Sequence, residues 1–205
     1  AQRLAEAERQ RQEEEAPSPP KDNPYSAYVV PEWDDPPKQV AVVTPPKPTD
    51  ANIDVNVMIA RGDEARNLGN YNEAVKWYRK AAEQGNAVGQ NNLGIMYSTG
   101  KGVDWDYSEA INWYRKAAEQ GYAVGQNNLG YMYHTGKGVD RDYSEAINWY
   151  RKAAEQGYGR SQAVLGLFYR DGLGVDEDHD EARKWLQKSV DHGFLKAKEY
   201  LSTLD

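Results

Sequence analysis

The sequence of 205 residues has no cysteine, and its ten prolines all lie between Pro17 and Pro48. The lack of cysteine excludes disulfides and thiol chemistry, and it removes the usual partner of histidine in a zinc site. No apolar run approaches the roughly 18 residues that a membrane-spanning helix needs, so the chain is not expected to cross a bilayer. The 25 basic residues are outnumbered by 32 acidic ones and never form a run longer than an adjacent pair. Nucleic acid and anionic lipid are therefore not expected partners.

The distribution of proline divides the chain into three parts. Residues 1–15 are mostly helix formers with one large apolar residue, Leu4, and we expect a charged helical or disordered segment there. Residues 16–50 are expected to form a proline-rich extended arm or linker. A plain spacer is one interpretation of this arm. Its apolar and aromatic residues instead favour contacts with another protein, or with the rest of this chain, through Tyr25, Tyr28, Trp33, Val40 and Val42.

The proline-free remainder, residues 51–205, is periodic. Residues 87–122 and 123–158 are two copies of one unit and differ at three positions. The same spacing continues on both sides, because Trp77, Trp113, Trp149 and Trp185 are equally spaced. We therefore expect a repeat domain with units at about 51–86, 87–122, 123–158 and 159–194, followed by a cap at 195–205.

Each unit predicts a helical hairpin. Its expected parts are an apolar stripe on a first helix, two glycines that end this helix, and an aspartate that begins the second helix and forms a capping box with a glutamate three residues later. In the second unit these are Gln90, Leu93, Gly94 and Tyr97, then Gly100 and Gly102, then Asp106 with Glu109. The first unit has only Gly69 and Asn70 as its turn, without the longer stretch that carries two glycines, and its helices are expected near 53–68 and 71–84.

The pattern Ala-x-x-x-Leu-Gly-x-x-Tyr-x-x-Gly-x-Gly-Val-x-x-Asp-x-x-x-Ala-x-x-Trp-Tyr-x-x-Ala-Ala-x-x-Gly resembles the Sel1-like repeat family, which is related to tetratricopeptide repeats. Residues 89–121 and 125–157 carry it well, whereas residues 161–193 depart from it at Leu186, Ser189 and Val190. The resemblance implies an all-α, right-handed superhelix, a solenoid of about four hairpins plus a C-terminal capping helix. It also implies a role in holding other proteins together, often in bacterial envelopes.

The positions at which the two copies differ are the candidates for partner recognition. They are Ile95 against Tyr131, Ser98 against His134, and Trp105 against Arg141. Residues 91, 95 and 98 share a stripe that is turned away from the core stripe, and the resemblance implies that first helices line the concave side. We therefore expect a groove of Asn91, Ile95, Ser98, Asn127, Tyr131, His134, Leu167 and Arg170, with Trp105 and Arg141 at a loop rim. The alternative is drift at unconstrained surface positions after duplication.

Catalysis and metal binding are not expected, and neither is a cofactor. Nearly every polar residue recurs with the repeat, whereas a catalytic constellation normally breaks such symmetry. The three histidines, His134, His179 and His192, fall at different repeat positions and are expected at the surface.

The predicted function is therefore that of a non-enzymatic scaffold or adaptor, which holds a partner segment in the groove and a second surface through the arm. One alternative is a permanent accessory subunit of a large bacterial membrane or envelope complex. A more distant one is a hydrolase related to β-lactam-binding repeat proteins. The expected partners are other proteins, with a membrane contacted only through one of them, and the oligomeric state is open.

The predicted location is the periplasm or cell envelope, because cleavage of a secretory signal would leave a small residue such as Ala1 at the start. The cytoplasm is the alternative.

Overall fold

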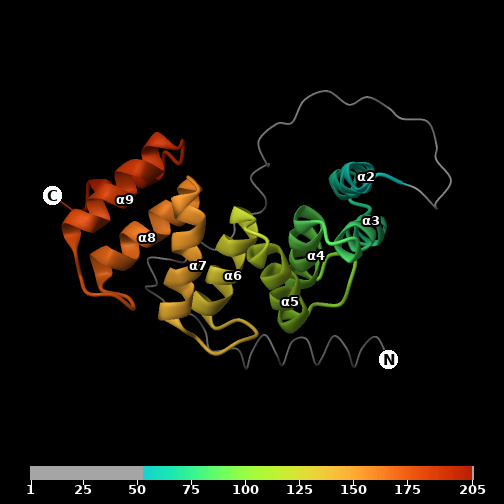
Figure 1. Ribbon diagram of the computed structural model, residues 1–205, viewed down its shortest axis with the longest axis horizontal. Coiled ribbons are helices and arrows are strands. Elements are labelled where there is room, and N and C mark those ends of the chain that lie inside the picture. Colours follow the sequence, from blue (N-terminus) through green and yellow to red (C-terminus); the bar gives the residue numbers. More distant parts are fainter. Residues whose placement is uncertain (1–52, 205) are drawn as a thin grey trace. The chain divides into compact units, whose positions relative to one another are not determined.

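The computed structural model describes residues 53–204, which contain nine α-helices (Figure 1). The predictions for residues 1–15 and for the arm, including the arm contacts, lie outside the described residues. The helices form four hairpins and a short final helix: α2 (Val55–Asn67) with α3 (Tyr71–Glu83), α4 (Ala87–Thr99) with α5 (Tyr107–Glu119), α6 (Ala123–Thr135) with α7 (Tyr143–Glu155), α8 (Gly159–Asp171) with α9 (His179–Asp191), and α10 (Ala197–Leu201).

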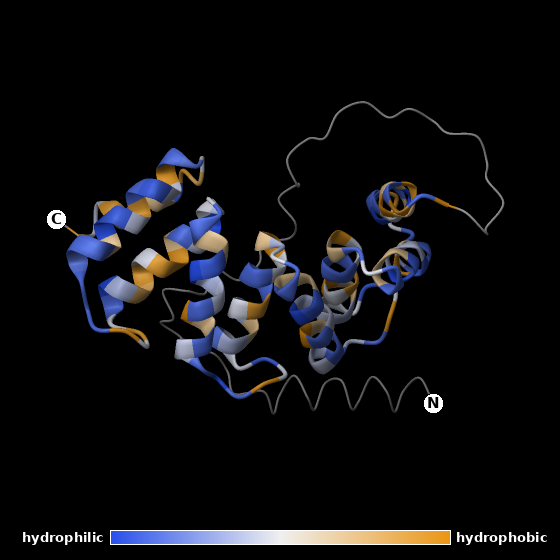
Figure 2. Ribbon diagram, in the orientation of Figure 1, coloured by the Kyte–Doolittle hydropathy of each residue, from blue (hydrophilic) through white to orange (hydrophobic). Residues whose placement is uncertain are grey.

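Each helix packs mainly against the helices before and after it in the chain, so the hairpins stack in sequence order. The predicted all-α solenoid is therefore confirmed. In the first hairpin, α2 and α3 fall within the expected ranges of 53–68 and 71–84. Figure 2 shows a nearly continuous run of hydrophobic residues in α8, where every residue from 161 to 168 is buried.

Within a hairpin, glycine lets the two helices approach closely. A Cβ at Gly94 would lie 2.8 Å from the ring of Tyr114. This buried aromatic side chain therefore packs directly on the backbone of α4, where residue 94 has no side chain. Tyr150 occupies the same position beside Gly130. The expected apolar face of the second helix, with its alanines and tyrosine, is thus packed against the first helix.

The turn inside the hairpin depends on left-handed glycines. Gly100 ends α4 with a φ of 65°, and Gly102 has a φ of 74°, both of which glycine adopts without steric cost. A side chain at Gly102 would overlap the backbone of Tyr71, where α3 begins. The turn of one repeat therefore rests directly on the second helix of the repeat before it.

Aspartate begins the second helices as predicted, but the capping box is not formed. The Asp106 carboxylate accepts a hydrogen bond from the Glu109 backbone N–H at 3.0 Å. The Asp106 backbone N–H, however, donates to the Tyr97 carbonyl at 3.0 Å, so it is not available to the Glu109 side chain. Asp142 repeats both bonds, with its N–H on the Tyr133 carbonyl. The prediction failed because the turn folds back onto the end of the first helix.

The C-terminal capping helix is present as α10. Ala197 and Leu204 are buried against Ala163, Ala182 and Leu186 of the last hairpin. These contacts cover apolar surface that another hairpin would cover inside the solenoid.

Candidate interaction surface

The first helices α4, α6 and α8 carry the residues of the predicted groove, and a ladder of polar side chains joins them. Asn128 Nδ2 donates to Asn91 Oδ1 at 2.9 Å, which links α6 to α4. Ser161 Oγ donates to Asn127 Oδ1 at 3.0 Å, which links α8 to α6. Asn91 and Asn127 are both buried, so their side chains bind neighbouring helices and form the floor of this surface.

The next groove position holds three different side chains and only one of them is appreciably exposed. Ile95 and Leu167 are buried, whereas Tyr131 is half-buried. Lys137 Nζ donates to the Tyr131 hydroxyl at 3.4 Å and lies 5.5 Å from the centre of its ring. Among the three residues at this position, Tyr131 is therefore the one that solvent reaches, and its aromatic ring has a cation beside it.

In α4 and α6 the third groove position faces the second helix of its own hairpin. Ser98 Oγ lies 2.9 Å from the Tyr114 hydroxyl. His134 is 5% exposed and packs edge-on against Phe168, with ring centres 5.0 Å apart, and near Tyr143 and Tyr150. Burial, followed by the positive charge of Arg141, lowers the pKa of His134 to about 4.

The prediction that His134 lies at the surface was therefore wrong, whereas His179 and His192 are exposed as expected. The reason is geometric. Residue 134 lies four positions after Gly130, which packs on Tyr150, so it continues the stripe that faces α7.

Arg170 and the two rim residues are placed separately from each other. Arg170 binds both carboxylate oxygens of Asp171, at 2.6 and 2.9 Å, and the Thr203 hydroxyl at 3.1 Å, which ties the end of α8 to the C-terminal cap. Trp105 Nε1 donates to the Ser98 carbonyl at 3.2 Å. Arg141 is exposed.

Two further sets of bonds between helices were missed by the sequence reasoning. Arg115 on α5 donates to the Tyr133 hydroxyl on α6 at 2.8 Å, and the same bond joins Arg79 to Tyr97 and Arg151 to Tyr169. Within a repeat, Gln120 Nε2 donates to Gln90 Oε1 at 2.7 Å, and Gln156 does the same to Gln126. The signal was present in the sequence as polar pairs recurring at a constant separation of 18 or 30 residues.

The described part of the chain offers neither a cluster of metal ligands nor a membrane-spanning helix. Within residues 53–204, no group of three or more histidine or acidic residues is placed to hold a metal ion. None of the helices from α2 to α10 is long and apolar enough to cross a membrane. The predicted envelope location stays a prediction.

Stacked hairpins with recurring bonds between neighbours define this chain as an α-solenoid repeat protein. The Sel1 repeat model matches residues 60–86, 87–122, 123–158 and 159–194. The chain belongs to the Sel1 repeat family, whose members generally serve as scaffolds that bind other proteins. Their solenoid fold is typically non-enzymatic.

Several solved structures are similar to this chain. A Sel1 repeat protein from Oxalobacter formigenes shares 39% identity with a TM-score of 0.69, over 73% of this chain and 63% of that one. A protective antigen of uropathogenic Escherichia coli shares 36% identity with a TM-score of 0.60, over 71% of this chain and 35% of that one. Cysteine-rich protein B of Helicobacter pylori shares 25% identity with a TM-score of 0.53, over 64% of this chain and 95% of that one.

The chain therefore spans less than two thirds of the length of the first two of these proteins. No curated protein matches it.

Proposed function

We propose that this protein is a non-enzymatic scaffold that holds a segment of a partner protein along α4, α6 and α8, while its proline-rich arm binds a second protein. The observation that supports this proposal is the difference between two otherwise identical repeats. Three positions differ between residues 87–122 and 123–158, and all three fall on the first helix or on the turn that follows it. A partner that contacts this side meets a different side chain in each repeat.

Because most of the predicted groove residues are buried, only a few side chains on this surface can touch the partner. Half-buried Tyr131, half-buried Trp105 and exposed Arg141 are accessible. These three residue types are enriched among the anchors of protein interfaces. The buried asparagines and His134 shape the surface from below.

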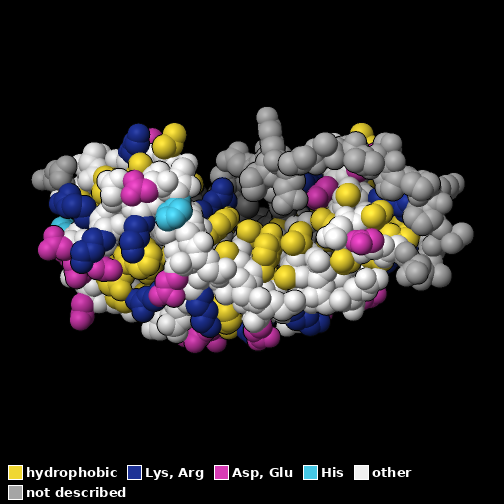
Figure 3. Space-filling model, turned by 45° about the horizontal axis from the view of Figure 1, so that its top comes forward, with side chains coloured by type: hydrophobic (Ala, Val, Ile, Leu, Met, Phe, Trp, Pro, Cys, Tyr) yellow, Lys and Arg dark blue, Asp and Glu magenta, His cyan; other side chains and the backbone are white. Residues whose placement is uncertain are grey.

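The face shown in Figure 3 has the composition that such an interaction needs. Hydrophobic side chains form a broken row across the middle of the repeat domain, with few charged side chains within it. Apolar surface that is depleted of charge at its centre is typical of the core of a protein interface.

The test uses the near identity of the two repeats. Tyr131→Ile, His134→Ser and Arg141→Trp together would make residues 123–158 identical to residues 87–122, so every new side chain is one that the other copy already carries at the equivalent position. The wild-type chain and this triple variant serve as baits for proteins of the native source. We expect the main captured protein to fall at least tenfold with the variant, while the helical circular dichroism signal stays unchanged.

Equal capture by both baits would overturn the proposed surface. A third bait that starts at Asp50 tests the arm, because loss of a captured protein from this bait alone assigns that protein to residues 1–49. Capture that survives high salt would favour the permanent accessory subunit over the adaptor.

A further inference from the structure

The last repeat lacks the hydrogen bond between two glutamine side chains that the second and third repeats contain. In three repeats the first-helix glutamine donates Nε2–H to an alanine carbonyl of the preceding repeat, and Gln162 makes this bond to Ala154 at 2.9 Å. In the second and third repeats the Oε1 atom of that glutamine accepts a 2.7 Å bond from the glutamine that ends the second helix. In the fourth repeat, the residue at this donor position is His192.

His192 cannot replace the missing donor in its neutral form. Its Nδ1 lies 2.8 Å from the Lys188 carbonyl, which can only accept, so Nδ1 carries the proton and Nε2 is bare. The ring also lies against Gly157, whose added Cβ would be 3.1 Å from Nε2, whereas the equivalent Gly121 has open space around it. The imidazole thus sits differently from the glutamine side chains.

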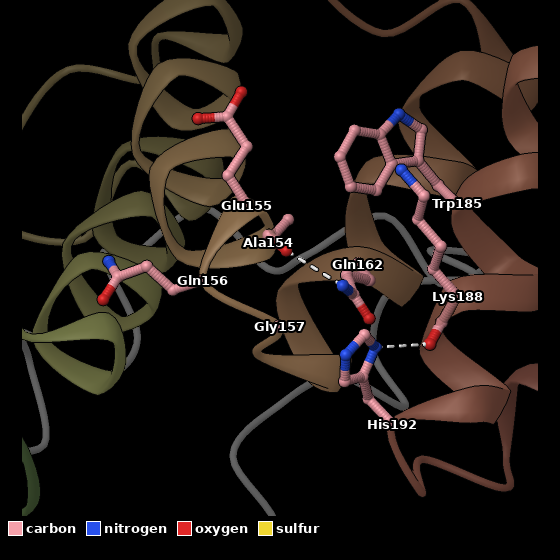
Figure 4. Close-up of a pocket in the computed structure, with 8 residues that line it drawn as sticks. All are labelled: Ala154, Glu155, Gln156, Gly157, Gln162, Trp185, Lys188 and His192. Carbon is pink, nitrogen blue, oxygen red and sulfur yellow. Dashed lines mark hydrogen bonds between the residues drawn. The ribbon is translucent and has the colours of Figure 1, made fainter.

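Gln162 is consequently a buried acceptor without a donor. Its side chain is 2% exposed, and Oε1 has no hydrogen-bond partner. It lines a hollow of about 400 Å³ together with Glu155, Trp185, Lys188 and His192 (Figure 4). In this view Oε1 points to the side of the hollow on which His192 lies. Trp185 is 9% exposed, and its Nε1–H is buried without a partner, as is that of the equivalent Trp113 in the second repeat.

We propose that this hollow binds a primary carboxamide, the side chain of a glutamine from another polypeptide, which donates its N–H to Gln162 Oε1. The two preceding repeats show which group fits, because there the amide of a glutamine side chain donates to the equivalent Oε1 atom. Lys188 lines the same hollow and is the donor available to the carbonyl oxygen of the ligand. A buried acceptor that has lost its contact with water binds such a donor because leaving it unpaired is costly. This site lies among α7, α8 and α9 and is separate from Tyr131 and the loop rim.

The binding test follows the indole N–H signals of the full chain by nuclear magnetic resonance at pH 8. The probe is N-acetylglutamine N-methylamide, and the comparator is N-acetylmethionine N-methylamide, which has the same secondary backbone amides and a side chain of similar length without a primary carboxamide. Because the ligand is small, we expect a Kd on the order of millimolar. The Trp185 signal should shift saturably with the glutamine probe and at least tenfold more weakly with the comparator.

Two matched variants keep this test decisive. His192→Gln restores the pair found in the other repeats, so it should weaken probe binding at least tenfold and raise the melting temperature by about 2 °C or more. Gln156→His should open an equivalent site at Gln126 and produce a second response at Trp149.

The absence of a saturable shift, equal binding of both probes, or unchanged binding by His192→Gln would each overturn the proposal. Free glutamine is a third probe. Tighter binding of this charged amino acid than of the capped form would overturn the polypeptide as the source of the carboxamide.

Discussion

Acidification should destabilise this protein through a single buried side chain. His134 is neutral inside the third hairpin, and burial together with the nearby Arg141 charge lowers its pKa to about 4 from the ordinary value of 6.5. As the pH falls below 6.5, the unfolded chain takes up a proton at this residue while the folded chain does not. The contribution of His134 to stability is therefore complete above pH 6.5 and is lost progressively as the pH falls to 4.

The size of the effect follows from the two pKa values. At about 1.4 kcal/mol per pKa unit, the difference between 6.5 and about 4 gives a loss of about 3 kcal/mol, of which about 2.5 kcal/mol has occurred by pH 4.5. Such a loss is a large share of the free energy of unfolding of an ordinary domain, which is about 5–15 kcal/mol.

The assay is urea unfolding, followed by tryptophan fluorescence, of the wild type and two variants between pH 7.5 and 4.5. His134→Ser supplies the side chain found at the equivalent Ser98, and His134→Phe keeps an aromatic ring. The two variants differ in size, so their stabilities at pH 7.5 will differ. Both should nevertheless lose about 2–3 kcal/mol less than the wild type on acidification. If all three proteins show the same pH dependence, His134 is not desolvated and the reasoning is refuted.

Two further predictions concern the junctions between helices. Gly102→Ala should cost about 3 kcal/mol or more, because its backbone has a positive φ and the added Cβ overlaps Tyr71, whereas Gly85→Ala has a similar φ with open space and should cost only about 1 kcal/mol. Urea unfolding of both variants measures the difference, and equal losses would show that contact with Tyr71 is unimportant. Tyr133→Phe removes the acceptor of the 2.8 Å bond from Arg115 and should cost about 1–2 kcal/mol by the same assay, while a cost near zero would assign that bond no role in stacking.

The fold was predictable from the sequence because each of its determinants is local and repeated. Left-handed glycines, N-cap aspartates and one apolar stripe per helix specify a hairpin, and repetition specifies the stacking. Asp106 illustrates a contact that the local sequence pattern did not predict. Its side chain caps α5 as expected, but the partner of its N–H is the Tyr97 carbonyl, which only the folded turn brings near.

The candidate site was less predictable, because a first helix of this solenoid is contacted on several sides. Asn91 was assigned to a partner-facing stripe and instead binds the next first helix, while His134 was assigned to the same stripe and faces α7. Periodicity gives the direction of a side chain along one helix. It does not say which neighbouring helix lies in that direction, and the glutamine pairs were missed for the same reason.

The bond from Arg115 to Tyr133 has a consequence for the length of the solenoid. The same donor and acceptor meet at three successive boundaries between repeats, from Arg79 to Tyr97 onward. If residues 87–122 were deleted, Arg79 would meet Tyr133, and the repeat that follows would differ from the deleted one only at Tyr131, His134 and Arg141. The solenoid can thus gain or lose a whole unit and re-form this bond at the new boundary, so that the distance between its two ends can be altered in fixed steps.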